Sequence, residues 1–460
     1  MKHLEKALLG LASISGFTGT TCSVQRETDS SDVPNIVLIM CDDMGIECMG
    51  YYGNIEYNTP NIDRLAAQSI RFDRCFAQPL CTPSRVKIMT GKYNFRNYED
   101  FGWLNPDQVT FGNLLQEAGY ATCVVGKWQL NGLNRNNPGN QDTKRPHHFG
   151  FDEYCLWQLH HARSEGERYA NPLITQNGRD LPGDENAYGP DIFADYISDF
   201  IARKSGNPFL VYYPMVLPHN PFVPTPDSPE WNDPEKRYEE DNKFFADMVE
   251  YIDKIVFRIE NALKDNDAWE NTILIFTSDN GTNQRIVSKT NQGDIIGGKG
   301  KTLNTGIHVP MIISWPKYIK QGKILLNPID FADILPTLAD AARIDPSTYS
   351  TDGISLFKVL TGTGSPVKNE IFMHYSKRWG SYERMSGHTR LVTNGIYKLY
   401  RNGEFYNTHN DPDEENPLPT LNEREQMIME KYDAILRQKE NEFPFSWNDK
   451  EFNPQLRNFQ

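Results

Sequence analysis

Residues 81–91 read Cys81-Thr82-Pro83-Ser84-Arg85-Val86-Lys87-Ile88-Met89-Thr90-Gly91. The segment places a thiol, a proline and an arginine at the start of a run that is compatible with a helix. Pro83 suits a first helical turn, because the N–H that proline lacks has no partner there. Free backbone N–H groups and the positive end of the helix dipole would favour an anion, and Arg85 adds a fixed positive charge. An isolated cysteine is more often a small buried residue, but this context favours a functional role for Cys81.

The same residues resemble the maturation signature of the formylglycine-dependent (type I) sulfatases, within the alkaline-phosphatase-like superfamily. In that family a Cys-x-Pro-Ser-Arg pattern, followed by Thr-Gly, marks a cysteine that is converted to formylglycine (3-oxoalanine). The resemblance implies that Cys81 is converted and that a formylglycine-generating maturation enzyme is a partner. It also implies that the aldehyde hydrate attacks sulfur. A thiolate is unsuited to this reaction, because sulfate-ester cleavage needs an oxygen nucleophile that can later expel sulfate.

Short apolar, β-branched runs alternate with helical patterns along most of the chain. The strand-like runs lie at 35–40, 121–125, 209–216, 272–276 and 311–314, and the helical patterns at 63–69, 191–203 and 242–263. This alternation predicts an α/β fold with a large, mainly parallel central sheet flanked by helices. The resemblance implies the same alkaline-phosphatase-like architecture.

A segment rich in Gly, Thr and Pro at 361–366 predicts a boundary between two units. We expect a sulfatase catalytic domain at 33–362 and a small C-terminal α+β subdomain at 363–460. Within the latter, an antiparallel sheet is predicted from runs at 390–393, 397–400 and 404–406, and a terminal helix at 422–438. The stretches at 397–400 and 410–414 also resemble the C-terminal subdomain of sulfatases.

Oxygen-bearing side chains follow two of the predicted strands. Asp42 and Asp43 come directly after the first strand, and Asp279 and Asn280 follow a later one. Ligand-binding residues of open α/β sheets collect at such strand ends. Carboxylate and amide oxygens suit a hard cation. These residues match the metal site of sulfatases, and the resemblance adds Cys81 as a ligand and implies one Ca²⁺ ion acting as a Lewis acid.

Two lysines and a histidine match further catalytic positions of the family. Lys127 ends a strand-like run, and Lys299 lies in the loop Gly297-Gly298-Lys299-Gly300-Lys301. The resemblance implies that both contact the sulfate and that His219 lies near the leaving oxygen. Paired with Lys299, His219 would protonate the departing sugar alkoxide. The predicted catalytic set is therefore Cys81, Arg85, Lys127, His219 and Lys299.

Two stretches depart from the family pattern. Sulfatases usually read Gly-Lys-Trp-His-Leu-Gly, with the histidine assisting collapse of the sulfated intermediate, whereas Gln129 stands in its place here. Gln129 cannot act as a base, but it can hydrogen-bond the hydrate. After the glycine loop, Asn304 and His308 replace two charged residues of the family's Glu-Gly-Gly-x-Arg-Val-Pro. Contact with substrate and a supporting role both remain open for His308.

Other polar side chains are candidates for the substrate pocket. His160 and His161 are candidates to replace the missing proton acceptor, and Arg96 follows the signature helix. Together with Gln129 and His308, these residues form the predicted substrate-binding set. Basic and aromatic residues around a sulfate pocket would suit a sulfated, uronate-containing sugar.

The composition of the 460-residue chain and its first residues limit the partners and the cellular location that we expect. A net charge of −14 argues against nucleic acid as a partner. Residues 1–22 resemble a secretory signal peptide, with Lys2 and Lys6 before an apolar stretch that is too short to span a membrane. Cys22 leaves a bacterial lipoprotein site open, so we expect membrane contact only through such a lipid anchor. We therefore expect export to the periplasm, the cell surface or the medium of a bacterium.

These observations predict a sulfatase, a sulfuric ester hydrolase of a bacterial polysaccharide-degrading system. The expected partner is a sulfated oligo- or polysaccharide, either algal, such as ulvan, fucoidan or a carrageenan, or an animal glycosaminoglycan. Two alternatives remain open at this point. One is a phosphodiesterase or phosphonate hydrolase of the same superfamily, and the other is a non-catalytic protein that binds sulfated glycans.

Overall fold

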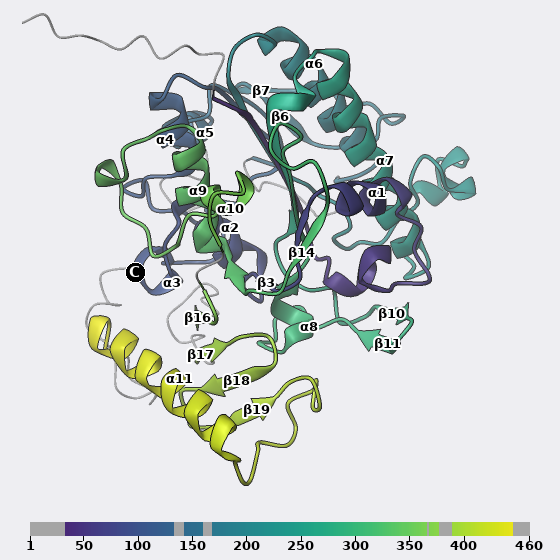
Figure 1. Ribbon diagram of the computed structural model, residues 1–460. Helices are drawn as coiled ribbons and strands as arrows, with labels where there is room; N and C mark the ends of the chain where they lie inside the picture. The colour runs from purple at the N-terminus through teal and green to yellow at the C-terminus, as the bar shows by residue number, and fades with distance from the viewer. Residues whose placement is uncertain (1–32, 133–141, 160–167, 366–367, 377–388, 445–460) are drawn as a thin grey trace, which may run out of the picture.

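A ten-stranded sheet forms the centre of the molecule (Figure 1). The computed structural model describes residues 33–132, 142–159, 168–365, 368–376 and 389–444. The strands follow the order β14-β2-β13-β9-β1-β8-β4-β5-β6-β7. Strands that are not consecutive in sequence lie side by side in this order, as expected where helices connect parallel strands.

Five neighbouring strands in the middle of this sheet are parallel. They are β9 (Thr272–Ser278), β1 (Asn35–Cys41), β8 (Phe209–Pro214), β4 (Ala121–Lys127) and β5 (Glu153–Trp157). Their nearly continuous apolar sequences are explained by burial on both faces. The predicted mainly parallel central sheet is therefore confirmed.

The outer strands include both parallel and antiparallel pairings with their neighbours. They are β13 (Met311–Ser314), β2 (Ile70–Phe72), β14 (Lys323–Leu325), β6 (Ile174–Gln176) and β7 (Arg179–Asp180). The predicted run at 311–314 belongs to the sheet, but β13 is antiparallel to both β9 and β2. On the opposite side, β6 is antiparallel to β5 and to β7.

Helices cover both faces of the sheet (Figure 1). One layer holds α1 (Pro60–Gln68), α6 (Gly189–Lys204) and α7 (Phe244–Asp265), and the other holds α2 (Cys81–Thr90), α4 (Phe111–Glu117) and α9 (Ile334–Ala341). Strand β1 contributes alternate side chains to the two hydrophobic cores, one on each face of the sheet. Val37 and Ile39 pack in the first layer, whereas Ile36 and Leu38 pack in the second, because successive side chains of a strand point to opposite faces.

Shorter elements complete the larger part of the molecule. The short helices are α3 (Asn94–Asn97), α5 (Arg145–His148), α8 (Asn304–Ile307) and α10 (Phe357–Leu360). A three-stranded sheet contains β12 (His308–Val309), β3 (Cys75–Phe76) and β15 (Ile329–Asp330), and β10 (Val287–Thr290) pairs with β11 (Gly293–Ile296). Within the ranges that the structure describes, no helix has the length and apolar character to cross a bilayer.

A separate antiparallel sheet lies near the C-terminus, in yellow-green in Figure 1. Its strands are β16 (Ile371–Tyr375), β17 (Thr389–Thr393), β18 (Tyr397–Tyr400) and β19 (Phe405–Asn407). Helix α11 (Glu423–Glu442) packs on it through Tyr432 and Leu436. The predicted small antiparallel sheet is confirmed, although β16 lies outside the predicted runs. The domain boundary at 362 stays a prediction, and residues 1–22 lie outside the described residues.

Gly126 allows β4 to approach β8 closely just before Lys127. Its φ angle is +106°, a conformation that side chains with a Cβ atom rarely adopt. A Cβ atom at this position would overlap the backbone carbonyl of Pro214. Gly119, two residues before the same strand begins, has a φ angle of +87°, but a Cβ atom there would meet nothing within 4 Å. Comparing alanine substitutions at the two glycines therefore distinguishes the effect of backbone strain from the effect of steric overlap.

We expect Gly126→Ala to destabilise the protein more than Gly119→Ala. Backbone strain alone destabilises by about 1 kcal/mol at Gly119. At Gly126 the overlap with Pro214 raises the expected loss to about 3 kcal/mol. Chemical denaturation of both variants measures the difference. Equal losses would contradict the close approach of β4 to β8.

Candidate active site

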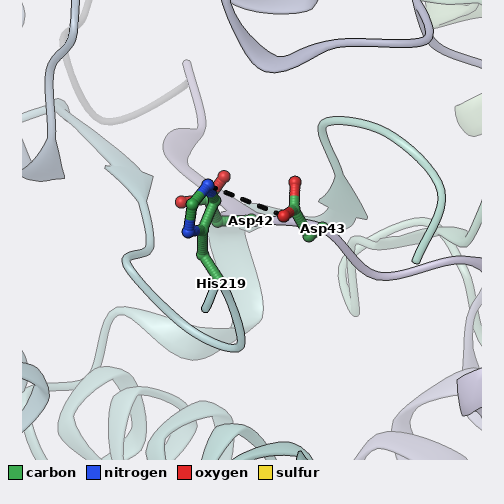
Figure 2. Close-up of side chains that lie close together, drawn as sticks. All are labelled: Asp42, Asp43 and His219. Carbon is green, nitrogen blue, oxygen red and sulfur yellow. Dashed lines mark ion pairs between the residues drawn. The ribbon is translucent and has the colours of Figure 1, made fainter. Parts of the chain in front are cut away.

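Asp42 and Asp43 lie where β1 ends and are fully buried. The N–H of Asp42 donates to the carbonyl of Leu217 (2.8 Å), and the N–H of Asp43 donates to Oδ1 of Asp279 (3.0 Å). Asp43 has a φ angle of +72°, which turns the chain out of the strand direction. Consequently the ligand atoms of Asp42, Asp43 and His219 all lie within 4.8 Å of one another (Figure 2).

Asp279 and Asn280 reach the same place from β9. Strands β1 and β9 are paired in parallel register, so their carboxyl ends meet. Asn280 Nδ2 donates to Oδ1 of Asp43 at 2.8 Å. Asn280 Oδ1 is buried and has no hydrogen-bond partner among the described residues. The four predicted oxygen-bearing residues are thus brought together.

Each of the three carboxylates pairs with a different cation. The pairs are Arg85 Nη2 with Asp279 Oδ2 (2.8 Å), Lys127 Nζ with Asp42 Oδ2 (2.7 Å), and Lys299 Nζ with Asp43 Oδ2. Arg85 also donates to the carbonyl of Lys127 at 2.9 Å, which links the signature helix to the end of β4. The structure therefore assembles the predicted cations and carboxylates into one buried cluster.

The electrostatics of the cluster differ between its carboxylates. Burial alone raises the pKa of Asp42, but the neighbouring cations, Lys127 foremost, outweigh it and hold that pKa well below its usual range. Burial and the negative charge of Asp42 together raise the pKa of Asp279, despite the nearby Arg85. Asp279 would therefore ionise more readily if another positive charge joined the cluster.

Cys81 is the first residue of α2, at the buried N-terminus of that helix. Ser84 Oγ accepts from the N–H of Gln78 at 2.9 Å and fixes the preceding loop. Burial raises the pKa of the Cys81 thiol, and the charges of Lys127, Asp279 and others in the cluster act on it. Six described cysteines, Cys81 among them, are buried and free of disulfides.

His219 faces Lys299 across the cluster. Its Nδ1 lies 2.6 Å from the carbonyl of Asn220, and a carbonyl can only accept, so Nδ1 carries the proton. Nε2 of the neutral ring is then an acceptor, 3.2 Å from Lys299 Nζ and 3.6 Å from Asp43 Oδ2. Burial, followed by the charges of Arg168 and Lys299, holds the pKa of His219 well below its usual range. The neutral ring is thus favoured.

Gln129 lies just beyond the end of β4, with a φ angle of +57°. Its Oε1 is buried and has no hydrogen-bond partner among the described residues. A buried amide oxygen usually finds a donor in the protein or in solvent. This unsatisfied acceptor is compatible with the predicted contact to a hydroxyl group, which stays a prediction.

The other predicted substrate residues have partners outside the cluster or lie outside the described residues. Arg96 pairs with Asp352 (3.0 Å) and Glu442 (2.7 Å). His308 Nε2 donates to the carbonyl of Asp73 at 2.9 Å, and burial lowers the pKa of this histidine to about 4. These contacts account for both positions, and the predicted contacts of Arg96 and His308 with substrate stay predictions. His160 and His161 lie outside the described residues.

Arg168 belongs to the cluster but was not predicted from the sequence. Its Nη1 lies 3.9 Å from Asp42 Oδ2 and 3.3 Å from the carbonyl of Asn220. The guanidinium covers the ring of Trp157, 4.3 Å from its centroid. No motif surrounds Arg168 in the sequence, so only the packing of distant segments reveals its place.

Comparison with known families identifies the chain. Residues 34–344 match the family model described as Sulfatase. This protein belongs to the sulfatase family. Residues 299–441 of this sulfatase also match the model described as N-sulphoglucosamine sulphohydrolase, C-terminal. The predicted family is confirmed, and with it the class of sulfuric ester hydrolases.

Individual relatives agree with this assignment. The sulfatase is 30% identical over 366 residues to N-acetylgalactosamine-6-sulfatase of Canis lupus familiaris, covering 72% of this chain and 66% of the relative. It also resembles the crystal structure of Ps i-CgsB in complex with k-i-k-neocarrahexaose, with a TM-score of 0.70, 24% identity and coverage of 91% and 94%. The structure of BT4656 in complex with its substrate D-glucosamine-2-N,6-O-disulfate gives a TM-score of 0.70 at 22% identity, covering 91% and 100%. At these identities the two solved structures establish the fold alone.

Proposed function

We propose that this sulfatase hydrolyses sulfate esters of a sulfated carbohydrate through a nucleophile made from Cys81. The observation that carries the proposal is the position of Cys81 at the buried N-terminus of α2, within the electrostatic reach of Lys127 and Lys299. A helix N-terminus and two ammonium groups favour the anionic sulfate. The same cations stabilise the charge that develops as the ester bond breaks.

The substrate class is inferred from the relatives. One relative is named for N-acetylgalactosamine 6-sulfate, and two structural neighbours hold a neocarrahexaose and a disulfated glucosamine. These names support a sulfated sugar of a glycosaminoglycan or an algal polysaccharide. Ulvan remains a prediction within that class.

The nucleophile in this proposal is formylglycine, made from Cys81 by a maturation enzyme. When present, the hydrated group supplies an oxygen nucleophile and a second hydroxyl whose deprotonation releases sulfate. Arg85, Lys127 and the N–H groups of α2 would hold the sulfate. The sequence predicted His219 as the proton donor, but the proton of its neutral ring lies on Nδ1, toward Asn220. Lys299, which donates toward His219 Nε2 at 3.2 Å, would therefore supply a proton to the leaving sugar oxygen.

The oxygen-bearing residues fit one Ca²⁺ ion. Asp42, Asp43, Asp279 and Asn280 provide the hard ligands that this ion prefers, and Cys81 after conversion would add another. Asn280 Oδ1 is buried with no hydrogen-bond partner in the described part of the chain. Burial and Asp42 raise the pKa of Asp279, as expected at a site that gains from a further cation. Bound calcium would supply Lewis-acid stabilisation of negative charge.

Export is part of the proposal and rests on the signal-like sequence of residues 1–22. These residues lie outside the described part of the chain, as does the proposed lipid-attachment residue Cys22. A bacterial enzyme that acts on extracellular polysaccharides needs such a route. Attachment at Cys22 stays a prediction.

Conversion of Cys81 is the first test of the proposed nucleophile. We expect the Cys81 peptide to show the thiol-to-aldehyde mass difference after expression in a host with sulfatase-maturing activity. The converted protein should release sulfate, but no phosphate, when matched esters are supplied. Cys81→Ala should lower turnover by at least about a thousandfold because it removes the nucleophile.

A second buried cysteine provides the matched control. Cys155 lies within β5, so Cys155→Ala makes the same chemical change away from the cluster and should retain turnover. Sulfate release by Cys81→Ala at the wild-type rate would refute the mechanism. Phosphate release in preference to sulfate would favour the phosphohydrolase alternative.

Calcium should stabilise the protein measurably. After chelation, adding calcium at one hundred times its Kd is expected to increase the free energy of unfolding by about 2.7 kcal/mol. Magnesium should stabilise less, because it retains its waters and demands octahedral geometry. Asn280→Leu should lose most of the calcium-dependent rise in Tm. A wild-type Tm that does not respond to calcium would exclude this site.

Gln129→His should accelerate release of sulfate from the covalent intermediate. The new imidazole would provide the base that Gln129 cannot, and a positioned base contributes about a hundredfold in favourable cases. We expect a faster steady-state rate with an unchanged initial burst, measured by rapid mixing. Gln129→Leu, which only removes the amide, should not accelerate it. An unchanged rate in Gln129→His would show that another group already accepts the proton.

A further inference from the structure

Arg168 is the surplus cation of the active site. Of the four cations that the described residues place there, Arg85, Lys127 and Lys299 each pair closely with a different carboxylate, and Arg85 also reaches Asp42 at 3.6 Å. Arg168 reaches only Asp42, at 3.9 Å, among the carboxylates of the described residues. Both oxygens of Asp42 already accept from Lys127, at 2.9 and 2.7 Å. Among the described residues, Arg168 therefore has no close carboxylate partner of its own.

The guanidinium of Arg168 is also incompletely hydrogen-bonded. The residue is 2% exposed, and its Nε has no hydrogen-bond partner in the ranges that the structure describes. Its Nη1 makes one long contact of 3.3 Å with the carbonyl of Asn220. A buried charged donor without a partner destabilises the fold. A ligand that accepts from Arg168 would relieve this unfavourable state.

Packing fixes the position of Arg168. Its guanidinium carbon lies 4.3 Å from the centre of the Trp157 ring, and the adjacent Tyr169 donates to the carbonyl of Val216 at 2.8 Å. The contact with Asn220 places Arg168 beside the residue that follows His219. In the proposed function Lys299, which lies 3.2 Å from His219 Nε2, faces the leaving sugar oxygen, and the charge of Arg168 acts on the same histidine ring. A sugar bound there would therefore lie near Arg168.

We propose that Arg168 binds a second anionic group of the substrate, a carboxylate or another sulfate carried by the sugar. This inference rests on the proposed function and narrows its substrate to sugars with two negative charges. A guanidinium matches such groups because its planar donors bind two oxygens at once. The competing role is orientation of Asp42, but the 3.9 Å separation makes Arg168 a weaker partner of Asp42 than Lys127.

The test compares Arg168→Gln with wild type on four sulfate esters. The esters are 4-nitrophenyl sulfate, glucosamine 6-sulfate, glucosamine-2-N,6-O-disulfate and a monosulfated disaccharide that contains a uronate. We expect wild type to prefer the esters with two anionic groups. Arg168→Gln should lower kcat/KM for these by about thirtyfold, mainly through KM, because a charged hydrogen bond is lost. Activity on 4-nitrophenyl sulfate should stay within about threefold, since that ester has no second anion.

Arg237 provides a matched control for the substitution. It is also buried and covers a tryptophan, 4.9 Å from the centre of the Trp231 ring, and it donates to the carbonyl of that residue at 2.7 Å. Arg237→Gln should therefore change neither the preference nor the KM values. A loss confined to the disulfate would assign the second anion to sulfate, and a loss confined to the uronate would assign it to a carboxylate.

Three results would overturn the proposal. They are an equal loss on every ester in Arg168→Gln, no loss on any ester, and a wild-type enzyme without preference for two anions. If wild type releases no sulfate from any ester, the proposed function fails, and calorimetry on Cys81→Ala still tests Arg168. There, tighter binding of the disulfate than of the monosulfate, abolished by Arg168→Gln, supports the inference, and equal binding refutes it.

Discussion

The constraint on which this structure depends is the confinement of several like charges in one buried volume. Asp42, Asp43 and Asp279 are all fully buried at the ends of neighbouring strands. Unpaired carboxylates in such a place would take up protons instead of remaining charged. Lys127 and the other cations hold the pKa of Asp42 well below its usual range, whereas burial and Asp42 raise the pKa of Asp279 despite its pairing with Arg85. The same pairing holds the cations at the place where we propose that sulfate binds. One arrangement of charges therefore stabilises the buried carboxylates and also supports the proposed reaction.

Several distant segments must converge to hold these charges in position. Strands β1 and β9 supply the acidic residues, β4 supplies Lys127, and the helix α2 supplies Arg85 and Cys81. The N–H of Gly300 donates to the carbonyl of Pro79 at 2.8 Å, which ties the loop of Lys299 to the loop before Cys81. Because each of these segments is held in place by another, the geometry of the active site depends on the packing of the whole sheet.

Much of this could be predicted from the sequence, because strand ends and family motifs are local patterns. Asp42, Asp279 and Lys127 each follow or end an apolar run, and the structure brings them together. The direction of β13 was not predictable, since an apolar run of this kind looks the same in either direction. Arg168 carries no motif, and its place depends on packing against Trp157 and on contact with Asn220, which is 52 residues away in the sequence. Gln129 stands out in the sequence because it departs from the family pattern, and its contact with the hydrate stays a prediction.

The small C-terminal sheet has a consequence for how this enzyme is built from units. Lys398 of β18 donates to the carbonyl of Thr302 at 2.7 Å, and Asn304 donates to Thr408 at 3.0 Å. Both contacts fall within five residues of Lys299. The C-terminal part of the chain therefore holds the loop of Lys299 in place, although none of the charged residues of the cluster described above comes from it. Exchange of that unit between related enzymes would alter the loop as well, so we expect the two parts to be inherited together.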